Sequence, residues 1–184
     1  MGFNKLTLPM DGRNVLGSMI NRCITAGFAE IVVVGGFEFA QQWPQIVGEP
    51  ILATYNPDFR SALSFSIRTG VRATSTPSCG YAVILADLLA LSPATMRLLN
   101  SEFTKRLQQD SACIIRPSYS QQFGHPVYFS SMYRSSLVSL DEMSTQQTLI
   151  ANFKQHFRNI PVSDPGVIMD IDTPEDLKKF PEVL

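Results

Sequence analysis

The stretch Tyr81-Ala82-Val83-Ile84-Leu85-Ala86-Asp87 decides how this sequence of 184 residues folds. Residues 81–85 carry no charge and have the length of a buried strand, and Asp87 ends the run. Pro93 then opens a segment whose apolar residues recur with helical spacing. The order of strand, carboxylate and helix is typical of an α/β fold whose strands are buried on both faces.

The same alternation of elements continues on both sides of this stretch. We expect further strands at residues 31–34, 51–55, 112–116, 127–129 and 166–169. We expect helices from Asn14 to near Gly27, at residues 38–43, 61–71 and 146–156, and one that begins at Thr173. The pattern predicts one domain over residues 1–184, a Rossmann-like three-layer α/β sandwich with a mostly parallel sheet.

Composition narrows the class of partner. The formal net charge is -1 and no dense run of Lys and Arg occurs, which argues against a nucleic-acid surface and favours a small-molecule or protein partner. The three cysteines are far apart and odd in number, so we interpret them as buried or half-buried thiols. The apolar run at residues 82–91 is too short to span a bilayer and contains Asp87. We expect a cytoplasmic protein without a membrane partner.

Carboxylates follow two of the predicted strands. In parallel α/β sheets the ligand crevice lies beyond the carboxyl ends of the strands, where Asp87 and Asp170 are both expected. Asp170 and Asp172 alternate along the chain, so in extended backbone both point to one side and can share a divalent cation. The alternatives are a turn or cap role for Asp87 and an interaction of Asp172 with the positive end of the following helix.

The other candidate residues are a turn and two isolated cations. Gly124-His125-Pro126 combines a flexible and a rigid residue around a histidine that either faces a ligand or is structural. Lys5 and Arg68 are either ligand-binding cations or solvated surface side chains. Gly35-Gly36 follows a predicted strand but lacks the third glycine and the lysine of the familiar phosphate loops.

Five segments in register along the chain resemble the MobA-like nucleotidyltransferases, and the pattern is nearest to that of the molybdenum cofactor cytidylyltransferases. They are residues 1–9, Asn56-Pro57-Asp58-Phe59 through Gly70, Leu85-Ala86-Asp87, residues 117–129 with Gly124-His125-Pro126-Val127, and Asp170-Ile171-Asp172-Thr173-Pro174-Glu175-Asp176-Leu177. The resemblance implies a fold of the nucleotide-diphospho-sugar transferase type. It also implies Mg²⁺, CTP or GTP as the nucleotide donor, and a pterin-type acceptor.

The resemblance implies a role for each matched residue. Lys5 corresponds to the phosphate-binding lysine and Asp87 to the metal-binding, catalytic aspartate, with Asp170 and Asp172 as further metal ligands. The nucleotide and substrate contacts are assigned to Asn56, Ser66, Arg68, Gly124, His125 and Pro126. The implied reaction moves CMP or GMP to molybdopterin and releases pyrophosphate, and the finished cofactor passes to a protein partner.

The sequence also differs from this family. Family members begin with a central strand and a glycine-rich loop, and this sequence starts after both, which predicts a slot in the sheet and suggests that Met1 is an internal methionine of a longer gene product. Leu88-Leu89 replaces the usual Met-Pro after Asp87, Ala62 replaces a glycine, and residues 141–147 replace a Gly-Asp block. The alternative function is therefore a non-catalytic relative that binds a nucleotide or a protein.

Overall fold

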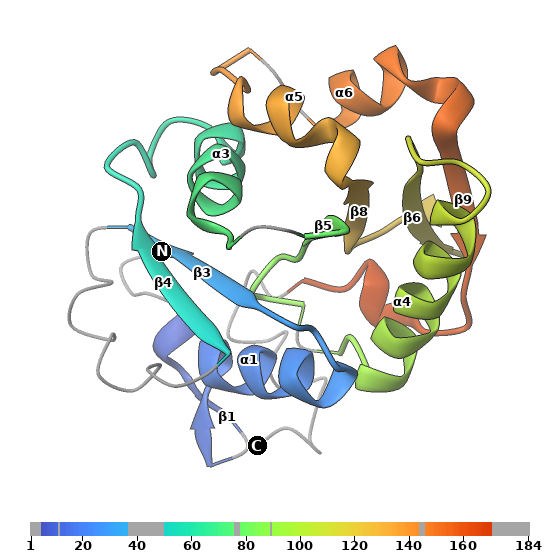
Figure 1. The fold of residues 1–184 in the computed structure, drawn as a ribbon. Helices are drawn as coiled ribbons and strands as arrows, with labels where there is room; N and C mark the ends of the chain where they lie inside the picture. Colours follow the sequence, from blue (N-terminus) through green and yellow to red (C-terminus); the bar gives the residue numbers. More distant parts are fainter. Residues whose placement is uncertain are drawn as a thin grey trace.

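A computed structural model describes residues 5–10, 12–36, 50–75, 78–88, 90–143 and 146–170 (Figure 1). The strands are β1 (Pro9–Met10), β2 (Arg13–Asn14), β3 (Ile31–Gly35), β4 (Ile51–Tyr55), β5 (Gly80–Val83), β6 (Ile114–Tyr119), β7 (Gln122–Phe123), β8 (Val127–Ser130) and β9 (Phe157–Pro161). The α-helices are α1 (Val15–Ala26), α3 (Leu63–Ala73), α4 (Pro93–Leu107), α5 (Arg134–Val138) and α6 (Gln146–Asn152). Short 3₁₀ turns are η1 (Lys5–Thr7), η3 (Ser131–Tyr133), η4 (Lys154–His156) and η5 (Pro165–Val167).

The longer strands run mostly in one direction. β3 and β4 pair in parallel. β8 lies between β5 and β6 and is antiparallel to both, and β9 is parallel to β6, so β5, β6 and β9 share a direction that β8 alone opposes among these four strands. This confirms the predicted α/β fold with mostly parallel strands. Within the described ranges, β3 and β5 belong to separate sheets.

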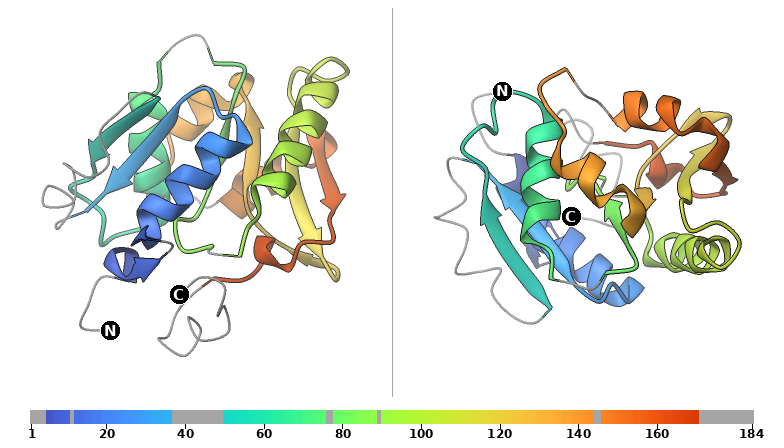
Figure 2. Two further views of the ribbon diagram at one scale, coloured as in Figure 1. Left: turned by 90° about the horizontal axis from the view of Figure 1, so that it is seen from below. Right: turned by 45° about the horizontal axis from the view of Figure 1, so that its top comes forward.

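Helices cover both faces of the strands and join the two sheets. α1 and α4 lie on one face, and α3, α5 and α6 lie on the other (Figures 1 and 2). From α1, Leu16 and Ile20 pack against Val33 of β3, whereas Met19 packs in the cluster that contains Leu88, beyond β5. The opposite face is joined by α3, which contacts β3 and β4 and also enters the cluster around β5, β6 and β8. Burial of apolar side chains on α1 and α3 therefore holds the two sheets together.

The helix ends follow the capping signals of the sequence. Asn14 accepts a hydrogen bond from the Gly17 N–H at 2.7 Å and caps α1, as predicted. Gly27 ends the helix in the left-handed region with φ of 84°. Ser92 caps α4, and Pro93 occupies its first turn.

The predictions for the last third of the described chain were partly wrong. The helix that begins at Gln146 ends at Asn152, before the predicted end at residue 156. Residues 166–169, predicted as a strand, start instead in η5, because Pro165 offers no N–H for a ladder and the Asp164 side chain accepts from the Gly166 N–H. The strand is β9, which the sequence analysis missed because polar, exposed residues interrupt its apolar pattern.

Several smaller expectations also changed. The helix expected at residues 61–71 begins at Leu63, which lies in the first turn of α3 and is 51% exposed. Cys23 and Cys113 are buried as expected, whereas Cys79 is exposed. The predicted helices at residues 38–43 and after Thr173 lie outside the described residues, as does Asp172. In the described ranges, no helix has both the length and the apolar character needed to cross a bilayer.

Candidate functional site

The centre of the candidate site is an ion pair at the carboxyl end of β5. The strand ends at Val83, two residues earlier than predicted, and Asp87 lies in the turn that follows. Lys5 of η1 places its Nζ 2.6 Å from Oδ2 of Asp87. The side chains are 31% and 19% exposed, so the pair is partly shielded but open to a ligand. Two residues that are 82 positions apart in the sequence thus form one charged centre.

Apolar packing brings the two charges together. Leu6 and Ala86, the neighbours of Lys5 and Asp87, both pack against the cluster formed by α1 and β3. The Val15 N–H at the start of α1 donates to the Leu8 carbonyl at 3.0 Å and fixes the segment that carries η1. The hydrophobic effect therefore places the pair, and the Coulomb attraction then selects the side-chain orientation.

The Gly124-His125-Pro126 turn is held by backbone contacts from two other segments. The His125 N–H donates to the Val167 carbonyl at 2.7 Å, and the Gly124 N–H donates to the Pro117 carbonyl at 2.9 Å. A Cβ at Gly124 would collide with the Val167 carbonyl, so only glycine fits this close approach. The peptide bond between His125 and Pro126 is cis. These contacts give the His125 ring a defined position near the β5 end.

Two opposite charges act on the His125 ring. Burial lowers the pKa of His125 below its usual 6.5, and the nearby Arg116 guanidinium lowers it further. The backbone of Val83 and the Asp87 carboxylate act in the opposite direction but do not outweigh these two causes. His125 is therefore neutral at pH 7, and the influence of both Arg116 and Asp87 places all three residues in one region of the molecule.

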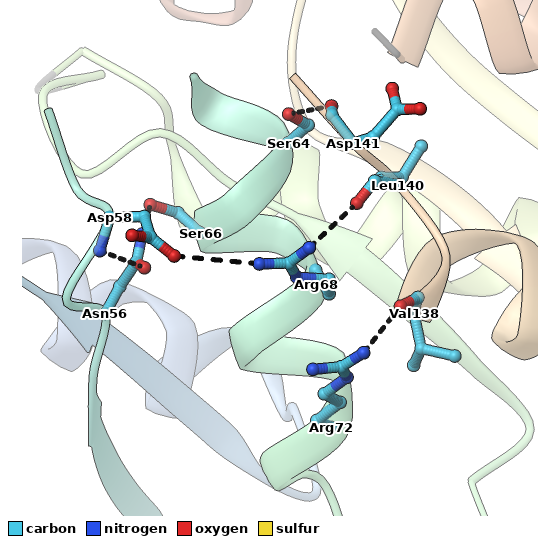
Figure 3. A network of polar contacts seen from close by, with 9 residues as sticks. All are labelled: Asn56, Asp58, Ser64, Ser66, Arg68, Arg72, Val138, Leu140 and Asp141. Carbon is cyan, nitrogen blue, oxygen red and sulfur yellow. Dashed lines mark hydrogen bonds and ion pairs between the residues drawn. The ribbon is translucent and has the colours of Figure 1, made fainter. Parts of the chain in front are cut away.

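The predicted nucleotide-side residues meet where β4 leads into α3 (Figure 3). The Asn56 side chain is 1% exposed. Its Nδ2 donates to Oγ of Ser66 at 3.0 Å, and its Oδ1 accepts from the Asp58 N–H at 3.0 Å. Asn56 and Ser66 thus form a buried link between β4 and α3, which shapes the turn between them.

Arg68 lies on the same helix and contacts a distant segment. Its Nη1 donates to the Leu140 carbonyl at 3.4 Å, and its Nη2 is 3.8 Å from Oδ2 of Asp58. The guanidinium also lies over the Phe65 ring, 4.4 Å from the centroid. Arg68 therefore connects the turn after β4 with the segment that follows α5 (Figure 3).

Two further residues of α3 that the sequence analysis missed complete this connection. Ser64 Oγ donates to the Asp141 carbonyl at 2.6 Å, and Arg72 Nη2 donates to the Val138 carbonyl at 3.1 Å (Figure 3). Residues 64, 68 and 72 are spaced by four and therefore share one helix face. Three hydrogen-bond donors spaced by four residues were the signal in the sequence from which this contact face of α3 could have been predicted. Val138 is the last residue of α5, so its carbonyl is an orphaned helix acceptor that the Arg72 cation satisfies.

A carboxylate that the sequence analysis also missed ties the η5 segment to α4. Asp164 Oδ2 accepts from the Ser92 N–H at 3.1 Å and from Thr95 Oγ1 at 2.6 Å, and its Oδ1 accepts from the Gly166 N–H at 2.8 Å. The segment held in this way carries Val167, whose carbonyl accepts from the His125 backbone. Asp164 thus fixes the η5 segment, and this segment in turn holds the His125 turn.

The predicted metal site is only partly assembled in the described residues. Lys5, Asp87 and His125 come together, but Asp170 is exposed and follows η5 instead of ending a strand. Within the described ranges, no group of three or more His, Cys, Asp or Glu side chains is placed to hold a metal ion. The site offers one half-buried carboxylate, a lysine and a neutral histidine.

The fold and the site define a class. An α/β sandwich with mostly parallel strands, whose charged centre lies beyond the carboxyl end of β5, is the architecture of nucleotide-handling enzymes. The family described as "MobA-like NTP transferase domain" matches residues 1–159. The chain belongs to this family, whose members are nucleotidyltransferases.

Individual relatives are similar at low identity. The purine catabolism protein PucB of Bacillus subtilis is 27% identical, with 96% of this chain and 87% of PucB covered. The molybdenum cofactor cytidylyltransferase of Escherichia coli is 24% identical, with 96% and 86% covered. The crystal structure of Rv0371c from Mycobacterium tuberculosis in complex with manganese superposes with a TM-score of 0.77 at 21% identity, covering 98% of this chain and 93% of that one. The last comparison establishes a shared fold.

Proposed function

We propose that this protein transfers CMP or GMP from CTP or GTP to a phosphate group of an acceptor such as the molybdenum cofactor, with release of pyrophosphate. Membership of the MobA-like family supports the transfer of a nucleotide, and the name of the E. coli relative supports this acceptor. The observation that carries the proposal is the Lys5–Asp87 pair beside the neutral His125 ring. The nucleotide is transferred to a pterin-type acceptor. The protein partner is then a protein that receives the finished cofactor.

A divalent ion fits the chemistry of Asp87. Carboxylate oxygens are the ligands that Mg²⁺ prefers, and Mg²⁺ commonly takes one or two of them together with phosphate oxygens and water. We assign this role to Asp87, with Asp170 and Asp172 as further ligands, and the manganese complex of Rv0371c supports divalent-ion use in this fold. When bound, the ion neutralises charge on the phosphate oxygens of the nucleotide.

In this reaction the Lys5 ammonium group can pair with either the Asp87 carboxylate or the phosphates of the nucleotide. In the structure its ammonium group neutralises Asp87. A bound polyphosphate offers more negative charge than one carboxylate, so Lys5 exchanges Asp87 for the phosphate oxygens and leaves the carboxylate for the ion. As pyrophosphate leaves, Lys5 stabilises the charge that builds on it.

The remaining residues orient the two substrates. Asn56 and Ser66 fix the turn after β4, and Arg68 holds its guanidinium beside that turn, which supports a role for them on the nucleotide side. Gly124, His125 and Pro126 form the rigid turn that we assign to the acceptor side. A neutral His125 hydrogen-bonds an anionic acceptor without adding positive charge that would repel the ion. Catalysis then rests mainly on positioning and charge stabilisation.

The experiment that tests the proposal is pyrophosphate release in the presence of CTP or GTP, Mg²⁺ and molybdopterin. Replacing Lys5→Met should lower the rate about 100-fold, because one preorganised donor to developing charge is lost. Lys105→Met is the matched control, since Lys105 is a 65% exposed lysine paired with Glu102 on α4. Equal rates for the two variants would contradict the assignment of Lys5.

A second candidate function is a non-catalytic relative that binds a nucleotide or a protein. It is favoured by the observation that Lys5 already pairs with Asp87 and that Arg68 already binds the Leu140 carbonyl. Calorimetry with CTP and GTP, with and without Mg²⁺, separates the two functions. Metal-dependent binding without release of pyrophosphate would indicate the non-catalytic relative, and turnover would indicate the enzyme.

A further inference from the structure

Arg116 on β6 is a half-buried cation without an anionic partner in the described part of the chain. Its Nε donates to the Gly124 carbonyl at 2.8 Å, and its guanidinium lies 5.4 Å from the centroid of the Phe123 ring. None of the ion pairs formed by the described residues includes it. A half-buried arginine normally gains a carboxylate or phosphate partner, because loss of hydration is otherwise uncompensated.

The electrostatic surroundings of Arg116 agree with this geometry. Burial lowers the pKa of Arg116, and no neighbouring carboxylate acts to restore it. Arg116 acts on the titratable ring of His125, which is neutral and contributes no negative charge. The Asp87 carboxylate also acts on His125 but is paired with Lys5. No carboxylate of the described residues therefore compensates for the burial of the guanidinium.

The hydrogen-bonding capacity of Arg116 is incompletely used. With Nε directed to Gly124, the two terminal nitrogens have no hydrogen-bond partner among the described residues. In the same region the buried Nδ1 atom of His125 also has no partner. Two terminal guanidinium nitrogens match two oxygens of a tetrahedral or planar oxyanion. The terminal nitrogens of Arg116 thus remain for a ligand, whereas Nδ1 of His125 is enclosed by the protein.

We propose that Arg116, which lies beside the turn at His125, binds the phosphate monoester group of the acceptor through its two terminal nitrogens. This proposal rests on the proposed function, because it names the chemistry of the second substrate. Arg116 lies beside the turn already assigned to the acceptor. Asn56, Ser66 and Arg68 lie instead where β4 leads into α3 (Figure 3).

The exposed ring of Phe123 indicates a second property of the expected ligand, a flat or apolar body. Its ring is 53% exposed and lies next to the guanidinium, so it offers an apolar surface beside the anion-binding group. A phosphate monoester with a flat or apolar body contacts both. Phenyl phosphate combines these features in a small molecule and is therefore the probe we choose.

The test is titration of the protein with phenyl phosphate, followed by ³¹P NMR and by the change in melting temperature. Arg116→Gln should weaken binding about tenfold or more, since charge-assisted, two-pronged hydrogen bonds are lost. Arg158→Gln is the matched control, because Arg158 lies on the neighbouring strand β9 and donates to the carbonyls of Gln155 and Phe157. Equal affinities of the two variants, or no binding by the unaltered protein, would overturn the proposal.

A second titration identifies the source of the phosphate. Binding of CTP with Mg²⁺ should change less than twofold in Arg116→Gln if the residue serves the acceptor. A loss of CTP affinity with unchanged affinity for phenyl phosphate would assign Arg116 to the nucleotide and overturn the proposal. If CTP binds neither to Arg116→Gln nor to the unaltered protein, the proposed function fails. The phenyl phosphate titration still decides the role of Arg116 in that case.

Arg116→Lys covers the case in which the glutamine variant does not fold. Lysine keeps the charge but presents a single point donor in place of a planar fork. We expect phenyl phosphate affinity to fall at least threefold in this variant, and an unchanged affinity would overturn the proposal. Far-UV circular dichroism confirms that the compared proteins are folded.

Discussion

Replacing Asp164 by alanine removes a carboxylate that links two parts of the fold. Its two oxygens accept hydrogen bonds from the Ser92 N–H, from Thr95 Oγ1 and from the Gly166 N–H. The first two donors belong to the start of α4 and the third to η5, so the variant leaves a helix N-terminus and a turn without their shared acceptor.

The structure sets the size of the expected loss. A hydrogen bond contributes about 1 kcal/mol net, and the donors here are only part-buried, so water replaces some of what Asp164 supplied. Three bonds then give a loss of about 3 kcal/mol in the free energy of unfolding. For a chain of 184 residues this corresponds to a melting temperature lowered by roughly 6–12 °C.

The pH dependence of stability provides an independent check. Burial alone would raise the pKa of Asp164, but hydrogen bonds from Thr95, Ser92 and Gly166 outweigh it and hold the pKa below the usual 3.8. A carboxyl with a lowered pKa in the folded state stabilises the fold at neutral pH and loses that contribution as the pH falls through its folded pKa. The deficit of Asp164→Ala should therefore be full at pH 7 and shrink below about pH 4.

Urea unfolding followed by circular dichroism measures both effects. Glu102→Ala is a matched control on α4, because its exposed pair with Lys105 contributes less than about 1 kcal/mol. A loss at pH 7 no larger than that of the control would refute the reasoning. So would a deficit for Asp164→Ala that stays constant down to pH 3, since it would not come from the ionised carboxylate.

Two further variants test the supports of the site. Gly124→Ala places a methyl group against the Val167 carbonyl, so we expect a loss of about 2–3 kcal/mol in urea unfolding and a shift of the His125 ring signals in NMR spectra; wild-type stability would show that the turn and η5 are not in close contact. Ser64→Ala removes the 2.6 Å hydrogen bond to the Asp141 carbonyl, so we expect a loss of about 1 kcal/mol and faster amide exchange near Asp141, and unchanged exchange there would argue against this link.

Much of the fold was predictable because it depends on local signals. The cap at Asn14, the stop at Gly27 and the Pro93 start of α4 each act within one helical turn, so neighbouring residues reveal them. β3 and β4 are uncharged runs, and the structure confirms both strands. The family resemblance was likewise readable, because motifs such as Leu85-Ala86-Asp87 are contiguous.

The failures occurred where pairing or a distant partner overrides the local pattern. β9 is a strand because β6 offers it a parallel ladder, although its residues are largely polar. The segment around Gly166 looks like a strand by composition, but Pro165 and the Asp164 side chain bend it into η5. Asp170 was consequently expected at a strand end that does not form.

The candidate site likewise has features that the sequence alone predicts and features that only the tertiary structure shows. The sequence alone determined the residue types at the site, since Lys5, Asp87 and His125 all lie in recognisable motifs. Only the tertiary structure decided that Lys5 pairs with Asp87, that Asp164 supports the His125 turn, and that Arg116 is left without a carboxylate. The physical reason is range: helix caps and apolar periodicity act over a few residues, whereas ion pairs and burial depend on which distant segments the packed core brings into contact.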